Sequence, residues 1–227
     1  MPEHPSSAGG RVFVLRHGQS HANVQRLIAS SPANALDGFG LTSTGHEQVR
    51  VSVTAARAAG SLGERVRVVS SPLLRARETA IIAAEVLGTA VHLDGRLAER
   101  SFGELELASD ESYAQVWEAD RADPSHERWG VESLESIHRR TTALLRELDV
   151  MQRTDGRGDV VLCTHGDVAS VLLCAAGGLA LSRHREVGAM GNGELRALRS
   201  LATDDDSQGA EGHVGAKTDL SGGMRAR

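Results

Sequence analysis

The stretch that decides the fold is Arg11-Val12-Phe13-Val14-Leu15-Arg16-His17-Gly18-Gln19-Ser20. Its first half is a short apolar run rich in β-forming residues, which is typical of a buried strand, and the run breaks at an Arg-His-Gly triplet. In open α/β sheets, parallel strands deliver the residues that follow them to the carboxyl edge, where ligands bind. The triplet therefore puts a permanent cation, an imidazole and a glycine at a predicted ligand site.

The length and composition allow a sizeable core, and a single α/β domain of this size is ordinary. The chain has 227 residues, of which 40% are hydrophobic, and no apolar run reaches the length of a membrane span. A net charge of −5 argues against a broad surface for nucleic acid or anionic lipid, but it leaves room for a small basic pocket. Cys163 and Cys174 lack metal-ligand spacing and are expected to be reduced core residues. The N-terminus lacks the apolar core of a secretory signal, so we expect a cytoplasmic protein.

Strands alternate with helical patterns along the chain, which indicates an α/β fold with a mostly parallel sheet and helices on both faces. After the opening run, the predicted strands cover residues 66–69, 91–93, 159–164 and 194–200. The predicted helices cover residues 42–59, 73–87, 111–121 and 132–153, and a last helix ends near 176. Residues 19–40 are expected to form a mobile loop beside the site. We predict a flexible N-terminus over 1–10, one domain over 11–201 and a disordered tail over 202–227.

Three of the predicted strands end in residues that bind anions. Arg16 and His17 follow the first strand, Arg75 comes shortly after the second, and His165 follows the strand at 159–164. Because the carboxyl ends of parallel strands share one edge, two guanidiniums and two imidazoles are expected to converge there. Taken alone, Arg75 fits a surface residue equally well, and a strand-end cap is the less favoured alternative for His165. Together, without carboxylates in the same segments, the four predict a site for a dianionic phosphoryl group.

These segments resemble the histidine phosphatase superfamily, in its first, phosphoglycerate-mutase-like branch. The resemblance runs from residue 11 to residue 198. It implies a three-layer α/β/α sandwich of the phosphoglycerate mutase-like kind. It also implies phosphoryl transfer through a phosphohistidine, with neither a metal nor an organic cofactor. The matching residues are Leu15-Arg16-His17-Gly18-Gln19-Ser20 with Asn23, Leu41-Thr42 with Gly45 and Gln48, Ser70-Ser71-Pro72-Leu73 with Arg75, Ala76 and Thr79, Leu97-Ala98-Glu99 with Phe102-Gly103, and His165-Gly166.

The chemistry assigns a role to each group at this edge. A neutral imidazole nitrogen attacks phosphorus, so His17 is the expected nucleophile, with its other nitrogen held by a carbonyl such as that of Gly18. Arg16 and Arg75 are expected to clamp the phosphoryl oxygens, and a protonated His165 to add a third cation. The candidate neutral donors are Gln19 and Asn23.

The leaving alkoxide needs a proton, so a carboxylic acid must stand at the mouth of the site. From the residues alone, Glu99, Glu104 and Glu106 are all candidates, and the resemblance selects Glu99 through the Phe102-Gly103 that follows it. A carboxyl group that faces a phosphate dianion has a raised pKa, which suits a proton donor. Asp167, two residues after His165, is the competing candidate.

Departures from the family pattern concern the substrate. After Phe102-Gly103 the family continues with an aromatic residue and Glu-Gly, whereas this chain reads Glu104-Leu105-Glu106-Leu107, so substrate contacts in this loop are not carried over. Arg100 either binds a second acidic group on the substrate or faces solvent. A contact from Ser133 to the site is a further candidate. The candidate aromatic wall residues are Phe39, Phe102, Tyr113, Trp117 and Trp129, although the helical pattern favours core packing for Trp117.

Three functions stay open at this point. The first is a phosphomonoesterase that acts on a small metabolite such as a sugar phosphate or a phosphoglycerate-type ester. The second is a cofactor-dependent phosphoglycerate-type mutase, although the chain between Phe102 and His165 is too short for the basic insertion that mutases use. The third is a non-catalytic protein that binds an anion or a partner, which the complete residue set disfavours. The expected partner is a small phosphate monoester rather than nucleic acid or membrane, and a homodimer is left open.

Overall fold

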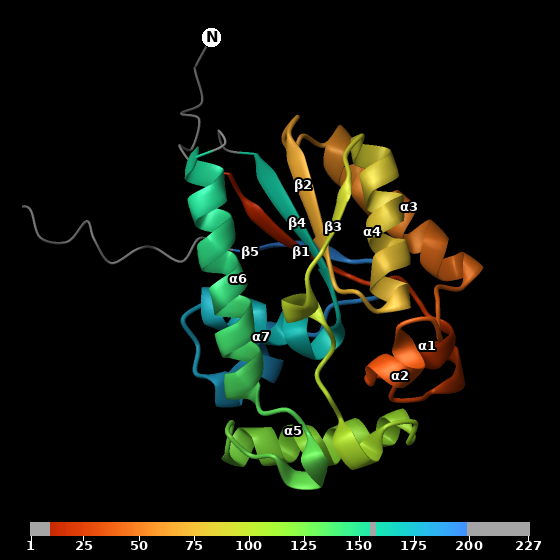
Figure 1. Ribbon diagram of the computed structural model, residues 1–227, viewed down its shortest axis with the longest axis vertical. Coiled ribbons are helices and arrows are strands. Elements are labelled where there is room, and N and C mark those ends of the chain that lie inside the picture. Colours follow the sequence, from red (N-terminus) through yellow and green to blue (C-terminus); the bar gives the residue numbers. More distant parts are fainter. Residues whose placement is uncertain (1–9, 155–157, 199–227) are drawn as a thin grey trace, which may run out of the picture.

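The computed structural model describes residues 10–154 and 158–198, and a five-stranded sheet lies at its centre (Figure 1). The strand order is β3-β2-β4-β1-β5. All neighbouring pairs are parallel except β5, which runs antiparallel to β1. The predicted mostly parallel α/β sheet is confirmed. The strands are β1 (Val12–Arg16), β2 (Val66–Ser70), β3 (Val91–Leu93), β4 (Asp159–Thr164) and β5 (Leu195–Leu198).

Helices cover both faces of this sheet, with α3 and α4 on one side and α6 and α7 on the other (Figure 1). Phe13 and Leu15 of β1 belong to the core cluster that holds Val49 and Val53, whereas Val14 belongs to the opposite cluster. Burial on both faces explains why the strand sequences are continuous apolar runs without alternation. The covering helices are α3 (Ser43–Ala58), α4 (Leu74–Leu87), α6 (Leu134–Thr154) and α7 (Gly166–Ala176).

Residues 19–40, predicted to be a mobile loop, instead contain two short helices, α1 (His21–Gln25) and α2 (Pro32–Ala35). The loop prediction is wrong because side chains cap this segment. Ser20 and Asn23 form a capping box at the start of α1. The carboxylate of Glu106 accepts hydrogen bonds from the backbone N–H groups of Ser30 and Ser31. The segment is thereby tied to a distant part of the chain, a contact that local sequence patterns do not reveal.

The remaining helical elements lie beyond one end of the sheet. Figure 1 shows α5 (Tyr113–Ala122) crossing below α6 and α7. A 3₁₀ segment, η5 (Leu181–Val187), connects α7 to β5. In the described residues no single helix is long and apolar enough to cross a membrane; the bent pair of α7 and η5 meets that test by length and composition only. The predicted N-terminus 1–10, except residue 10, and the predicted tail 202–227 lie outside the described residues, as do the last two residues of the predicted strand 194–200.

The strand register brings the predicted site residues together. In the parallel pair of β1 and β4, Arg16 lies opposite Thr164, and the N–H of His17 donates to the Thr164 carbonyl at 3.0 Å. His17 and His165 are therefore the first residues beyond two adjacent strands. On the other side of β4, the N–H of Ser71 donates to the Cys163 carbonyl at 3.0 Å. The predicted convergence of the three strand ends is confirmed.

Gly18 is required by a close approach of the backbone. A Cβ at this position would lie 2.4 Å from the carbonyl oxygen of Gly45, in the first turn of α3. The N–H of Gly18 also donates to Thr79 Oγ1 at 3.2 Å. The glycine thus lets the end of β1 pack directly against α3 and α4, which fixes the position of the preceding His17.

Candidate active site

The His17 ring is held in one tautomer. Its Nδ1 lies 2.8 Å from the Gly18 carbonyl oxygen, and its Nε2 lies 3.1 Å from Nε of Arg75. A carbonyl only accepts and a guanidinium only donates, so the ring proton is on Nδ1 and the lone pair is on Nε2. The predicted hydrogen bond to Gly18 is confirmed. The nitrogen available for attack is Nε2.

The environment also keeps this ring neutral. His17 is buried, and burial lowers its pKa well below the ordinary value, with the charges of Arg75 and Arg16 lowering it further. A neutral ring retains its lone pair at physiological pH. The arrangement therefore provides a nucleophilic nitrogen beside two permanent cations.

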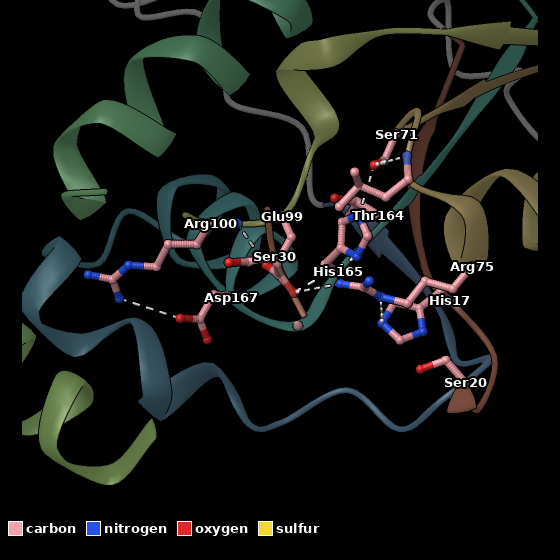
Figure 2. A network of polar contacts seen from close by, with 12 residues as sticks. His17, Ser20, Ser30, Ser71, Arg75, Glu99, Arg100, Thr164, His165 and Asp167 are labelled. Atoms are coloured by element: carbon pink, nitrogen blue, oxygen red, sulfur yellow. Dashed lines mark hydrogen bonds and ion pairs between the residues drawn. The ribbon is translucent and has the colours of Figure 1, made fainter. Parts of the chain in front are cut away.

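His165 differs from its predicted state. Its Nε2 lies 2.8 Å from Ser71 Oγ, and its ring centroid lies 5.3 Å from that of His17 (Figure 2). Burial, followed by the charge of Arg75, lowers the pKa of His165 well below its ordinary value. The prediction that His165 is protonated is therefore wrong, and its ring is neutral. Because Ser71 can donate its hydroxyl hydrogen to Nε2, the neutral ring still carries a donor on Nδ1.

Three buried donors around His17 have no partner. Within residues 10–154 and 158–198, only four buried side-chain nitrogen or oxygen atoms lack a hydrogen bond. Three of them are Arg16 Nε, Arg75 Nη1 and His165 Nδ1, and the fourth, His184 Nε2, is outside this group. An unsatisfied buried donor is costly, so a cluster of three indicates a site completed by an acceptor-rich ligand.

Glu99 is the carboxyl group that reaches this cluster. Its Oε2 lies 3.9 Å from both Arg75 Nη2 and His165 Nδ1, and its Oε1 accepts from the backbone N–H of Arg100 at 3.0 Å. The preceding Leu97 carbonyl accepts from Thr164 Oγ1 at 2.8 Å, which anchors the Glu99 segment to the end of β4. Sequence reasoning had three candidate glutamates, and this geometry favours Glu99.

The pKa of Glu99 suits a proton donor. Burial, and then the charge of Asp167, raise it to about 7, while Arg75 acts in the opposite direction. Glu106, by contrast, has a lowered pKa because Ser30 and Asn34 hydrogen-bond its carboxylate, which outweighs its burial. Only Glu99 of these two is poised to exchange a proton near neutral pH.

A cavity of about 400 Å³ opens over these groups. Its lining includes Arg16, His17, Arg75, Glu99 and the predicted neutral donor Asn23. His165 is fully buried and does not itself line the cavity. In the described part of the chain, no cluster of three His, Cys, Asp or Glu residues could hold a metal ion. Cys163 and Cys174 are buried and unpaired, as predicted.

The structure does not bring Gln19 to the cavity. Its side-chain oxygen accepts from Thr42 Oγ1 at 2.8 Å, at the start of α3. Ser133 is also used elsewhere, because its hydroxyl accepts from the N–H of Ser136 in α6. Neither residue is among those that line the cavity. Both have roles at helix starts.

Arg100 is the main correction to the predicted site. Its side chain is fully buried, and its guanidinium pairs with Asp120 through two hydrogen bonds of 2.7 and 2.8 Å. It also lies 3.4 Å from Asp167 and donates to the Glu132 carbonyl. Figure 2 shows it pointing away from His17 and toward Asp167. Both predicted alternatives, a substrate contact and a solvent-facing side chain, are therefore wrong.

We expect Arg100→Met to destabilise the fold, because it removes the permanent cation that pairs with the buried Asp120 and leaves that carboxylate with His126 Nε2, at 2.9 Å, as its hydrogen-bond partner. Removing one partner of a buried ion pair costs about 3–5 kcal/mol of unfolding free energy. Denaturant unfolding measures the loss. Arg121→Met is the matched control, since Arg121 pairs with Glu118 on the surface, where both side chains are at least 70% exposed, and should lose less than about 1 kcal/mol. Equal losses in the two variants would contradict this account.

Of two further cavity residues, Trp117 is the less favoured wall candidate of the sequence, and Arg185 is not predicted from it. Trp117, favoured as core packing, lines the cavity and donates from Nε1 to Asp167 at 3.1 Å. Arg185 lines it from η5, a charged segment without periodicity that carries no sequence signal. Among the other predicted aromatic wall residues only Tyr113 lines the cavity, with Phe102 buried behind it against the Tyr113 ring. Phe39 and Trp129 do not line it.

Comparisons with known proteins agree with this geometry. The family model of the histidine phosphatase superfamily (branch 1) matches residues 12–207. The chain is similar to the glucosyl-3-phosphoglycerate phosphatase of Mycolicibacterium vanbaalenii, with 31% identity over 92% of this chain and 93% of the relative. It is 30% identical to the protein of the same name from Mycobacterium tuberculosis, over 83% of this chain and 84% of the relative.

A solved structure shows the same fold. The mycobacterial glucosyl-3-phosphoglycerate phosphatase in complex with VO3 superimposes with a TM-score of 0.68 and 27% identity, over 83% of this chain and 90% of the other. The predicted phosphoglycerate mutase-like fold is confirmed. The family match, the fold and the histidine-arginine cluster agree, and this chain belongs to branch 1 of the histidine phosphatase superfamily and is a phosphomonoesterase.

Proposed function

We propose that this enzyme hydrolyses a sugar phosphate or phosphoglycerate-type ester through a phosphohistidine on His17. The observation that carries the proposal is the set of unpaired buried donors, Arg16 Nε, Arg75 Nη1 and His165 Nδ1, beside His17, whose Nε2 keeps the lone pair and accepts from Arg75 Nε. A phosphoryl group supplies the oxygens that these donors lack. Two guanidiniums also match the charge of a phosphate dianion.

In the first step, Nε2 of His17 attacks phosphorus and the bond from phosphorus to the ester oxygen breaks. The Nε–H of Arg75, which donates to Nε2 of His17, then donates to a phosphoryl oxygen instead. Arg16, Arg75 and His165 stabilise the charge on the equatorial oxygens of the loose transition state. Glu99, whose pKa burial raises to about 7, gives its proton to the departing alkoxide.

In the second step, Glu99 works in the opposite direction. As a carboxylate, it takes a proton from a water molecule that attacks the phosphohistidine. The bond between Nε2 and phosphorus breaks, phosphate leaves, and His17 and protonated Glu99 are restored. A pKa near the working pH lets one carboxyl group serve as acid and then as base.

The substrate class rests on the cavity and on the relatives. A volume of about 400 Å³ is at the small end of ligand sites and suits a metabolite rather than a polymer. Relatives over nearly the whole chain carry the name glucosyl-3-phosphoglycerate phosphatase. We propose that the substrate is a small metabolite of this kind and that the enzyme acts in the cytoplasm. We do not expect it to bind nucleic acid or membrane.

The test is a panel of phosphate esters assayed for phosphate release at low enzyme concentration and ranked by kcat/KM. We expect release from sugar phosphates or phosphoglycerate-type esters without a bisphosphate primer. Isomerisation without net phosphate release, dependent on such a primer, would favour the mutase. No turnover of any ester would favour a binding protein and contradict the proposal.

A further inference from the structure

The cavity contains a second cationic position beyond the phosphoryl site. Apart from Arg16 and Arg75, the arginines that line it are Arg26 and Arg185. Arg26 is paired on the outside with Asp110 at 2.9 Å and is 62% exposed. Arg185 comes from η5, is 29% exposed, and is the cation that the cavity wall presents.

One edge of the Arg185 guanidinium is unused. Nη1 donates to Ser170 Oγ at 3.5 Å and lies 3.5 Å from Asp167 Oδ1. Among the described residues, no hydrogen bond or ion pair engages its Nε or Nη2. These two nitrogens form the side edge of the fork, which is the edge that binds a carboxylate through two parallel hydrogen bonds.

Trp117 fixes the orientation of this guanidinium. The Arg185 Cζ lies 3.8 Å from the Trp117 ring centroid. The edge of the Trp117 ring is fixed by the hydrogen bond from Nε1 to Asp167. The Tyr113 ring stacks with the Trp117 ring, with 5.3 Å between the ring centroids and 5° between the ring planes. The ring is therefore held on two sides, and an arginine placed flat on it loses little freedom when it binds a ligand.

The negative charge of Asp167 does not prevent Arg185 from binding an anion. Its side chain is only 5% exposed and its oxygens already accept from Trp117 and from Arg100. The Asp167 carboxylate is thus already hydrogen-bonded within the wall, whereas the more exposed Arg185 keeps two donor nitrogens without a partner. At this position the wall therefore offers a ligand the Arg185 cation rather than the Asp167 carboxylate. The two carboxylates farther along the lining, Asp110 and Glu111, are paired with Arg26.

We propose that Arg185 binds a carboxylate on the leaving group, so that the substrate is the phosphate monoester of a hydroxy acid. This inference rests on the proposed function and names the group that the enzyme recognises beyond the phosphate. It gives Arg185 the specificity role that the sequence had suggested for Arg100. The phosphate lies between Arg16 and Arg75, and the carboxylate lies across the same small cavity.

The test compares two esters that differ in one group. 3-Phosphoglycerate carries a carboxylate where glycerol 3-phosphate carries a hydroxymethyl group. We expect the wild-type enzyme to prefer the carboxylate by kcat/KM, and Arg185→Gln to lower that preference about 10- to 100-fold, the range for a hydrogen-bonded charge pair. Arg185→Lys keeps the charge without the fork and should fall between them. The matched control is Arg183→Gln in the same segment, where Arg183 pairs with Glu186 and does not line the cavity; its preference should not change.

An unchanged preference in both Arg185 variants would overturn the inference, as would a wild-type enzyme that treats the two esters alike, which would indicate recognition of hydroxyl groups instead. Turnover of p-nitrophenyl phosphate, which lacks a carboxylate, shows whether the phosphoryl site itself works. A wild-type enzyme that releases phosphate from none of the three compounds would overturn the proposed function and this inference with it.

Discussion

Replacing His17 with alanine is expected to lower kcat/KM for every phosphate ester by at least about 10⁴-fold, the scale of losing a covalent nucleophile. The reason is that no other described nitrogen has the same combination of properties. Nε2 of His17 keeps its lone pair because Nδ1 is bound to the Gly18 carbonyl and burial keeps the ring neutral. His165 Nε2 is already bound to Ser71 Oγ. Steady-state phosphate release from an alkyl and an aryl ester measures the effect.

His46→Ala is the matched control for this variant. His46 is exposed on α3 and does not line the cavity, so its removal should leave turnover unchanged. Thermal unfolding of both variants shows whether each is folded. Turnover near the wild-type level in a folded His17→Ala enzyme would contradict the assignment of the nucleophile.

Replacing Glu99 with glutamine should separate substrates by their leaving groups. Alkyl esters should lose about 10²- to 10⁴-fold in kcat/KM, because their alkoxides need a proton, and aryl esters should lose far less. The pH profile should change as well. In the wild type, kcat/KM for an alkyl ester should fall above pH 7, because the Glu99 carboxyl group, with its pKa of about 7, loses the proton that it donates. The glutamine variant should lack this decline.

The same raised pKa predicts a pH-dependent stability difference. A folded-state pKa above the ordinary 4.5 means that the folded protein binds this proton more tightly. The resulting stabilisation is complete below pH 4.5 and is lost as the pH rises through 7. Glu99→Gln should therefore raise Tm relative to the wild type more at pH 8 than at pH 5. Equal losses of kcat/KM on alkyl and aryl esters, without such a Tm shift, would show that another group donates the proton. Asp167 would be the first candidate.

The sheet and the phosphoryl site could be predicted because local patterns specify both. Apolar runs mark the strands, and parallel pairing then brings the strand ends to one edge of the sheet. The sequence positions alone therefore predict that four side chains meet there: Arg16, His17, Arg75 and His165. The glycine-mediated approach of β1 to α3 was not visible in the sequence, yet it fixes where His17 lies.

What could not be predicted depends on long-range pairing and burial. Arg100 and Arg185 are both arginines in charged segments. Only the fold shows that Arg100 forms a buried ion pair with Asp120, whereas Arg185 is partly exposed in the cavity wall. The protonation of His165 was predicted wrongly for a similar reason. Its pKa depends on burial and on the cations that surround it, and these lie far apart in the sequence.

Trapping of the covalent intermediate tests the central claim most directly. The enzyme is mixed with a ³²P-labelled substrate, quenched in alkali within milliseconds, digested and mapped. We predict one labelled peptide that contains His17, with label that is stable to alkali and lost in mild acid, as expected of a phosphohistidine, and absent in His17→Ala. Label on a carboxyl or hydroxyl group, or full turnover without any label on the protein, would contradict the account.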